Sequence, residues 1–224
     1  MQYDGLLLDH DGVLVELLEL SAVLTGIREH GEPCFRRLGL DPVSASLDAL
    51  GVGTDSERVQ ALADGHGVDA EALWRCRDDA VEETLHAATR AGEKDPYDDI
   101  GALRQLDLPR GVVSNNQRRI VEYILSAHDL RGLFETVCAR EPTLGSLDRK
   151  KPAPTYIETA MADLGVEQPL YVGDSESDVR AAHRAGVDIA FLRRAHNADT
   201  SLSTEPTYEV TSLQEVVALG RPWV

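Results

Sequence analysis

Lysine is scarce in this chain. Only Lys94, Lys150 and Lys151 are present among 22 basic residues, which face 39 acidic residues and leave a formal net charge of −17. An acidic surface repels nucleic acid and anionic lipid, so the composition predicts neither a nucleic-acid partner nor a membrane partner. Because the acidic residues are spread along the whole chain, we expect a halophilic protein; an ordinary acidic protein is the alternative.

Cysteine and long apolar runs are scarce as well. The three cysteines, Cys34, Cys76 and Cys138, are far apart and form no CxxC or Cys/His cluster. Buried free thiols are therefore favoured over a zinc site or a disulfide framework. No apolar run is long enough to span a bilayer, and the first residues lack the basic and apolar regions of a secretory signal. These features predict a cytoplasmic protein.

The chain does contain short apolar runs that alternate with helical patterns, which favours an α/β fold built on a parallel sheet. Helices are expected at 118–128, at 154–164 and at 177–185, the last ending at Gly186. Strands are expected at 3–8, 111–114, 136–139, 170–172, 189–192 and, at an edge, 208–210.

The region 17–94 differs, because it contains no convincing strand. Its expected helices are 20–30, 43–50, 56–66 and 70–90, separated by glycines and prolines. An all-helical block between the first strand and the rest of a sheet is typical of an inserted cap domain. We therefore expect two domains, an α/β core formed by 1–16 and 95–224, and a helical cap formed by 17–94.

Two acidic motifs follow expected strands. Asp9 and Asp11 lie in Asp-His-Asp-Gly at the end of the first strand, and Asp174 and Asp178 lie in Gly-Asp-Ser-Glu-Ser-Asp after the fourth. Ligands of open α/β sheets bind at the carboxyl ends of strands. Buried carboxylates are costly without a cation, which favours a metal site; helix capping is the alternative for the second motif.

Two further motifs complete the set. Ser114 and Asn115 end the second strand, where a hydroxyl and free amides suit a phosphate oxygen, although a Ser/Asn helix cap explains them equally well. Lys151 lies with Lys150 before Pro152. In a chain so poor in lysine, this pair indicates a task that needs a compact ammonium, and a solvated surface is the alternative.

In this order, the four motifs resemble those of the haloacid dehalogenase superfamily. The resemblance covers residues 1–16 and about 95–224, and the helical insert resembles the cap of the subclass that contains phosphoglycolate phosphatase and β-phosphoglucomutase. It implies a Rossmann-like core with strand order 5-4-1-2-3. Lys151 matches the family lysine better than Lys150, and Val13 stands where the family often has threonine.

The resemblance also implies roles. Asp9 would be the nucleophile that forms an aspartyl-phosphate, and Asp11 the general acid and base. Mg²⁺ would be the cofactor. The implied metal ligands are the carboxylates of Asp9 and Asp174 and the carbonyl of Asp11, with Asp178 binding directly or through water. The implied phosphate-binding residues are Gly12, Ser114, Asn115 and Lys151.

The resemblance thus predicts a magnesium-dependent phosphatase, a monomer or homodimer, acting on a small phosphorylated metabolite. A phosphomutase of the β-phosphoglucomutase type and a non-enzymatic phosphate- or metal-binding regulator are the alternatives. A dehalogenase is disfavoured, since family dehalogenases lack the aspartate corresponding to Asp11. His10 is expected beside the site, and the other histidines, including His196, are expected to be surface or packing residues.

Overall fold

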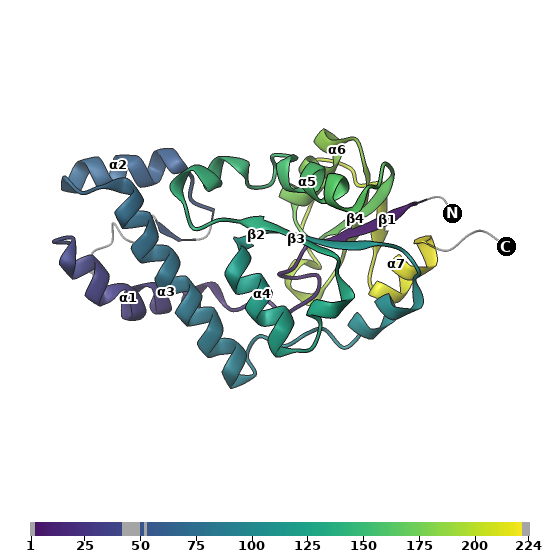
Figure 1. The fold of residues 1–224 in the computed structure, drawn as a ribbon, viewed down its shortest axis with the longest axis horizontal. Coiled ribbons are helices and arrows are strands. Elements are labelled where there is room, and N and C mark those ends of the chain that lie inside the picture. Colours follow the sequence, from purple (N-terminus) through teal and green to yellow (C-terminus); the bar gives the residue numbers. More distant parts are fainter. Residues whose placement is uncertain (1–2, 42–49, 52, 221–224) are drawn as a thin grey trace. The chain divides into compact units, whose positions relative to one another are not determined.

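The structure is a computed structural model that describes residues 3–41, 50–51 and 53–220. These form two compact units (Figure 1). One contains the chain up to Leu17, Asp95–Ala139 and the chain from Arg149 onward, and the other contains Leu18–Lys94 and Arg140–Asp148. The sequence analysis assigns 140–148 to the α/β core, whereas these residues pack with the helices of the second unit.

The first unit is built on a six-stranded parallel sheet whose order is β3-β2-β1-β4-β5-β6. The expected order 5-4-1-2-3 is confirmed, with β6 added beyond β5. The strands are β1 (Gly5–Leu8), β2 (Arg110–Gln117), β3 (Thr136–Arg140), β4 (Pro169–Gly173), β5 (Asp188–Leu192) and β6 (Tyr208–Val210).

Helices cover both faces of this sheet (Figure 1). The core on one face joins strand residues such as Leu7, Val113 and Tyr171 to the apolar stripes of α5 and α6. The α-helices of this unit are α4 (Arg118–Ala127), α5 (Thr155–Leu164), α6 (Glu176–Ala185) and α7 (Leu213–Gly220), and the short 3-10 helices are η2 (Ile100–Gln105), η3 (Arg131–Leu133) and η5 (Ala195–Asn197). The expected cap at Gly186 is confirmed, with φ 73°.

The second unit contains α1 (Leu20–Arg37), α2 (Ser56–His66), α3 (Ala70–Ala91) and the 3-10 helix η4 (Leu144–Arg149), whose final residue lies in the first unit. Local signals explain α2 and α3. The carboxylates of Asp55 and Asp69 accept from backbone amides of the first turns, and Gly67 and Gly92 end the helices in the left-handed conformation. The helix expected at 43–50 falls mainly outside the described residues.

The end of α1 differs from the expectation. Gly31 and Pro33 were expected to stop the helix near His30, but it continues to Arg37. The packing of α1 against α3 outweighs the local cost of proline here. The ring of Phe35 is fully buried and packs where a side chain on Gly31 would lie.

The prediction of free thiols is wrong for two of the three cysteines. Cys34 of α1 and Cys76 of α3 form a disulfide, with their Cα atoms 5.6 Å apart. The sequence contains no signal for this pair because 42 positions separate the two residues, and only the packing of α1 against α3 brings them together. Cys138 is a buried free thiol, as predicted.

Among the described helices, none combines the length and the apolar character needed to cross a membrane.

Candidate active site

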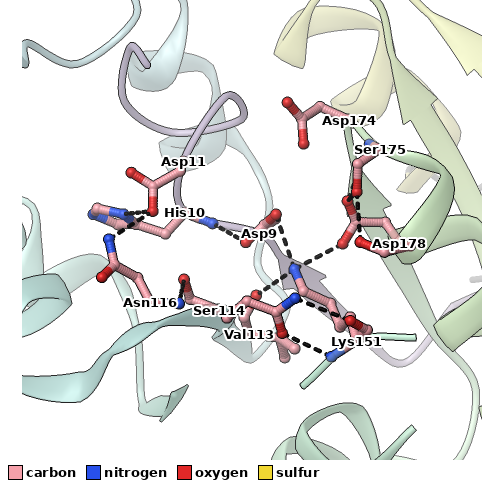
Figure 2. A network of polar contacts seen from close by, with 12 residues as sticks. Asp9, His10, Asp11, Val113, Ser114, Asn116, Lys151, Asp174, Ser175 and Asp178 are labelled. Atoms are coloured by element: carbon pink, nitrogen blue, oxygen red, sulfur yellow. Dashed lines mark hydrogen bonds and ion pairs between the residues drawn. The ribbon is translucent and has the colours of Figure 1, made fainter. Parts of the chain in front are cut away.

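The predicted site residues of the first unit meet at the carboxyl ends of β1, β2 and β4 (Figure 2). Parallel strands place these ends along one edge of the sheet, so motifs far apart in the sequence become neighbours. The side chains of Asp9, Asp174 and Asp178 each place an oxygen within 4.8 Å of the others. Three clustered carboxylates are a donor set suited to a hard divalent cation.

Lys151 lies between two of these carboxylates. Its Nζ is 2.8 Å from Asp9 Oδ2 and 2.7 Å from Asp178 Oδ1. The same Nζ donates to the carbonyl of Val113 and to the hydroxyl of Tyr171. Lys151 is therefore the lysine of the pair that reaches the site, and its side chain is only 2% exposed.

Burial and neighbouring charges together determine the pKa values of Lys151, Asp178 and Asp9. Burial alone lowers the pKa of Lys151, but the carboxylates of Asp178 and Asp9 outweigh it and raise that pKa. Burial raises the pKa of Asp178, yet the charge and hydrogen bond of Lys151 lower it overall. For Asp9, burial dominates and, with the like charges of Asp178 and Asp174, raises the pKa well above its usual value despite Lys151.

The raised pKa of Asp9 bears on the fit of a metal. The site has three carboxylates against the single ammonium of Lys151, so like charges disfavour the ionised form of Asp9. A divalent cation among them supplies the missing positive charge. The donor set of Asp9, Asp174 and Asp178 therefore fits a divalent cation such as Mg²⁺.

Asp178 is held by the protein on both oxygens. Oδ1 accepts from Tyr171 and faces Lys151, while Oδ2 accepts from the backbone amide and the hydroxyl of Ser175. The hydroxyl of Tyr171 is fully buried and bridges Lys151 and Asp178. The sequence predicts only a buried strand position for this tyrosine, so its role in the site was missed.

The loop after β1 approaches Asp174 closely. Gly12 has φ +79°, and a Cβ there would collide with the carboxylate of Asp174. The same carboxylate lies 2.6 Å from Nε2 of His196, and Asn197 donates to the carbonyl of Asp174. His196 is exposed, as expected for a surface residue, but its contact with Asp174 was not predicted, and no local pattern in the sequence indicates it.

Asp11 and the end of β2 form the other side of the site. Asn116 Nδ2 donates to Asp11 Oδ2 at 3.0 Å, and the buried ring of His10 lies 3.4 Å from that oxygen (Figure 2). Ser114 is buried beside them. The side chain of Asn115 bonds the backbone of Lys151 through both its oxygen and its nitrogen.

Comparison with known proteins identifies the family of this chain. The model of the family of haloacid dehalogenase-like hydrolases matches residues 43–192, more than half of the chain. The chain therefore belongs to the haloacid dehalogenase-like hydrolases, and within them it resembles the phosphoglycolate phosphatase subclass. Asp9 and Asp11 precede the matched residues, so only the fold brings them into the site.

The relatives are named phosphatases. Phosphoglycolate phosphatase of Escherichia coli (strain K12) is 30% identical over 129 residues, which are 56% of this chain. The chain spans about half the length of the curated relatives it matches.

Solved structures share the fold over almost the whole chain. The crystal structure of a predicted phosphoglycolate phosphatase from Haemophilus somnus 129pt has a TM-score of 0.68 at 21% identity and covers 99% of both chains. CbbY from Rhodobacter sphaeroides, solved in complex with phosphate, has a TM-score of 0.62 at 19% identity and covers 96% of both chains.

Proposed function

We propose that this protein is a magnesium-dependent phosphomonoesterase that hydrolyses a small phosphorylated metabolite through an aspartyl-phosphate on Asp9. The observation that carries the proposal is the cluster of Asp9, Asp174 and Asp178 around the buried ammonium of Lys151. This cluster combines a carboxylate nucleophile, a donor set for a cation and a fixed positive charge for a phosphoryl oxygen.

In the first step, a carboxylate oxygen of Asp9 attacks phosphorus and the bond from phosphorus to the alcohol oxygen breaks. Asp11 gives its proton to the departing alcohol. In the second step, water attacks the phosphorus of the aspartyl-phosphate, and the Asp11 carboxylate takes a proton from that water. Phosphate leaves, and Asp9 and Asp11 return to their starting states.

The remaining groups of the site bind the phosphoryl oxygens and stabilise their negative charge. Ser114, Lys151 and the backbone amides near Gly12 and Asn115 would bind the phosphoryl oxygens. When bound, Mg²⁺ supplies positive charge against those oxygens and the carboxylates. Because protein donors occupy both oxygens of Asp178, we propose that this residue contacts the metal through water and mainly anchors Lys151.

Charge counting supports the need for the metal. Ionised Asp9, Asp174 and Asp178 and a phosphate dianion have a total charge of −5. Mg²⁺ and Lys151 together contribute +3. Backbone amide dipoles have to stabilise the remaining charge of −2. We propose in addition that residues 17–94 act as a cap that selects the substrate, on a core formed by 1–16 and 95–224.

The test is a phosphate-release screen over many phosphomonoesters with Mg²⁺ and high KCl. It begins with 2-phosphoglycolate because the curated relatives are phosphoglycolate phosphatases. Asp9→Asn is expected to lose several orders of magnitude in rate while folding normally, and EDTA to abolish activity. A folded Asp9→Asn enzyme with near-normal turnover would overturn the proposal.

Two outcomes separate the alternatives. A product in which the phosphoryl group is retained on a second hydroxyl, without phosphate release, would indicate a phosphomutase. Halide release from 2-chloropropionate in the presence of EDTA would indicate a dehalogenase, because expulsion of a halide requires neither a proton from Asp11 nor a metal.

A further inference from the structure

Successive side chains at the end of β2 face different parts of the site. Asn115 bonds the backbone of Lys151 at 2.7 and 3.1 Å. The next side chain, that of Asn116, points to Asp11, and its Nδ2 donates to Oδ2 at 3.0 Å (Figure 2). The end of one strand therefore joins the segment that carries the phosphate-binding lysine to the proposed general acid.

The orientation of the Asn116 side chain follows from its other bonds. Its Oδ1 accepts from the backbone amide of Gln117 at 2.9 Å, and its own backbone amide donates to Ser114 Oγ at 3.1 Å. An amide oxygen accepts and an amide nitrogen donates. Because a donor holds the oxygen end, the NH₂ end has to face Asp11.

The ring of His10 flanks the same oxygen of Asp11. His10 is fully buried, and its Nδ1 lies 3.4 Å from Asp11 Oδ2. The backbone amide of His10 donates to Asp9 Oδ1 at 2.7 Å, which joins this residue to the proposed nucleophile as well. The Asp11 side chain is therefore limited on one side by a packed ring and on the other by an amide donor.

We propose that Asn116 is a positioning residue that holds Asp11 in the orientation needed to protonate the leaving alcohol. This inference rests on the proposed phosphatase function and deepens it. A neutral carboxyl group carries its proton on one oxygen. Since Oδ2 accepts from Asn116, the proton belongs on Oδ1, from which it passes to the alcohol oxygen as the bond to phosphorus breaks.

The experiment compares Asn116→Ala and Asn116→Asp on two substrates. One is 2-phosphoglycolate, or whichever alkyl phosphate is hydrolysed fastest in the screen, and the other is p-nitrophenyl phosphate. An alkoxide leaves poorly without a proton, whereas p-nitrophenolate leaves readily. Both variants are expected to lose about 10- to 100-fold in kcat on the alkyl phosphate, and much less on p-nitrophenyl phosphate.

The two variants separate positioning from folding. Asn116→Asp keeps an oxygen that accepts from Gln117, but it replaces the donor that faces Asp11 by an acceptor and adds a negative charge. Asn116→Ala removes the donor without adding charge, so a loss shared by both variants is assigned to the missing donor. Thr211→Ala is the control, because Thr211 also donates a hydrogen to a carboxylate, Glu215 Oε1 at 2.9 Å, at an exposed position just before α7. It is expected to leave both rates unchanged.

A double-mutant cycle completes the test. If Asn116 acts through Asp11, adding Asn116→Ala to Asp11→Ala should cost little further rate on the alkyl phosphate. Equal losses on both substrates, or additive losses in the double variant, would overturn the inference and leave the phosphatase standing. A wild type that hydrolyses neither substrate nor any other phosphomonoester would overturn both.

Discussion

Single residues determine the chemistry of the site through their immediate partners, and Lys151 is the clearest case. Its ammonium contacts two carboxylates, a carbonyl and a phenol, so a strongly hydrated ion is buried without losing its interactions. Burial of an unpaired ammonium would favour its neutral form. Here the pKa of Lys151 is raised, so the positive charge persists at any physiological pH.

Tyr171→Phe tests how far this arrangement depends on the phenol. The change removes the hydroxyl that donates to Asp178 and accepts from Lys151, while the ring still fills the core. Hydrogen bonds to charged groups contribute about 1.5–3 kcal/mol, so kcat/KM for phosphate release is expected to fall roughly 10- to 100-fold.

Tyr208→Phe is the control for Tyr171→Phe. The hydroxyl of Tyr208 accepts from Tyr3, away from the carboxyl ends of the strands, and its loss should leave turnover unchanged. Equal kinetics for Tyr171→Phe and the wild type would show that Lys151 and Asp178 need no phenol between them.

At the scale of elements, short segments hold the catalytic loops. The 3-10 helix η5 is three residues long, yet Asn197 bonds the carbonyls of both Asp174 and Leu192, and His196 contacts the Asp174 carboxylate. Behind His196, the hydroxyl of Tyr97 lies 3.4 Å from its Nδ1. The helix η5 therefore restrains Asp174, the proposed metal ligand, at both the backbone carbonyl and the carboxylate of that residue.

Replacement of His196 by alanine is expected to weaken Mg²⁺ binding about 10- to 100-fold, the usual cost of losing a group that orients a metal ligand. The measurement is a calorimetric titration of the protein with Mg²⁺ in the absence of substrate. His183→Ala, an exposed histidine on α6, is the control. Unchanged or tighter Mg²⁺ binding by His196→Ala would contradict the expectation.

The helical unit depends on a buried ion pair of its own. Arg140 forms a bidentate pair with Asp78 of α3, at 2.7 and 2.8 Å, and Arg77 contacts the same carboxylate. Both guanidinium groups lie over the ring of Trp74, 4.8 and 5.1 Å from its centroid. Trp74 is buried, and the pair attaches 140–148 to α3.

Asp78→Ala is expected to lower the free energy of unfolding by about 3–5 kcal/mol, since it leaves two buried guanidinium groups without their carboxylate. Urea unfolding followed by circular dichroism measures this change. Asp64→Ala, which removes an exposed acid of α2, should shift the urea midpoint little. Similar midpoints for the two variants would exclude a stabilising role for the Asp78 cluster.

At the scale of the whole molecule, charge is the dominant property. A net charge of −17 on 224 residues creates repulsion that salt screens over about 10 Å at 0.1 M and about 3 Å at 1 M. We expect the melting temperature and the rate of phosphate release to rise from dilute buffer to molar KCl. A melting temperature independent of KCl would remove the prediction of a halophilic protein without affecting the proposed chemistry.

The parallel sheet was predictable from the sequence because its central strands contain local apolar runs. The positions of Asp9 and Asp174 followed, since each directly ends or follows such a run. The course of α1 beyond Pro33 and the Cys34–Cys76 disulfide were not predictable, because they depend on packing between helices that are distant in the sequence.

The sequence by itself determined the order of the motifs, the elements that carry them and the family to which they point, since these follow from local apolar patterns and residue types. Only the tertiary structure decided which donors hold each carboxylate. Asn116 and Asp11 are 105 positions apart, and His196 and Asp174 are 22 apart. Contacts of this kind depend on the distances between strand ends and loops after packing, and no local preference of the chain encodes them.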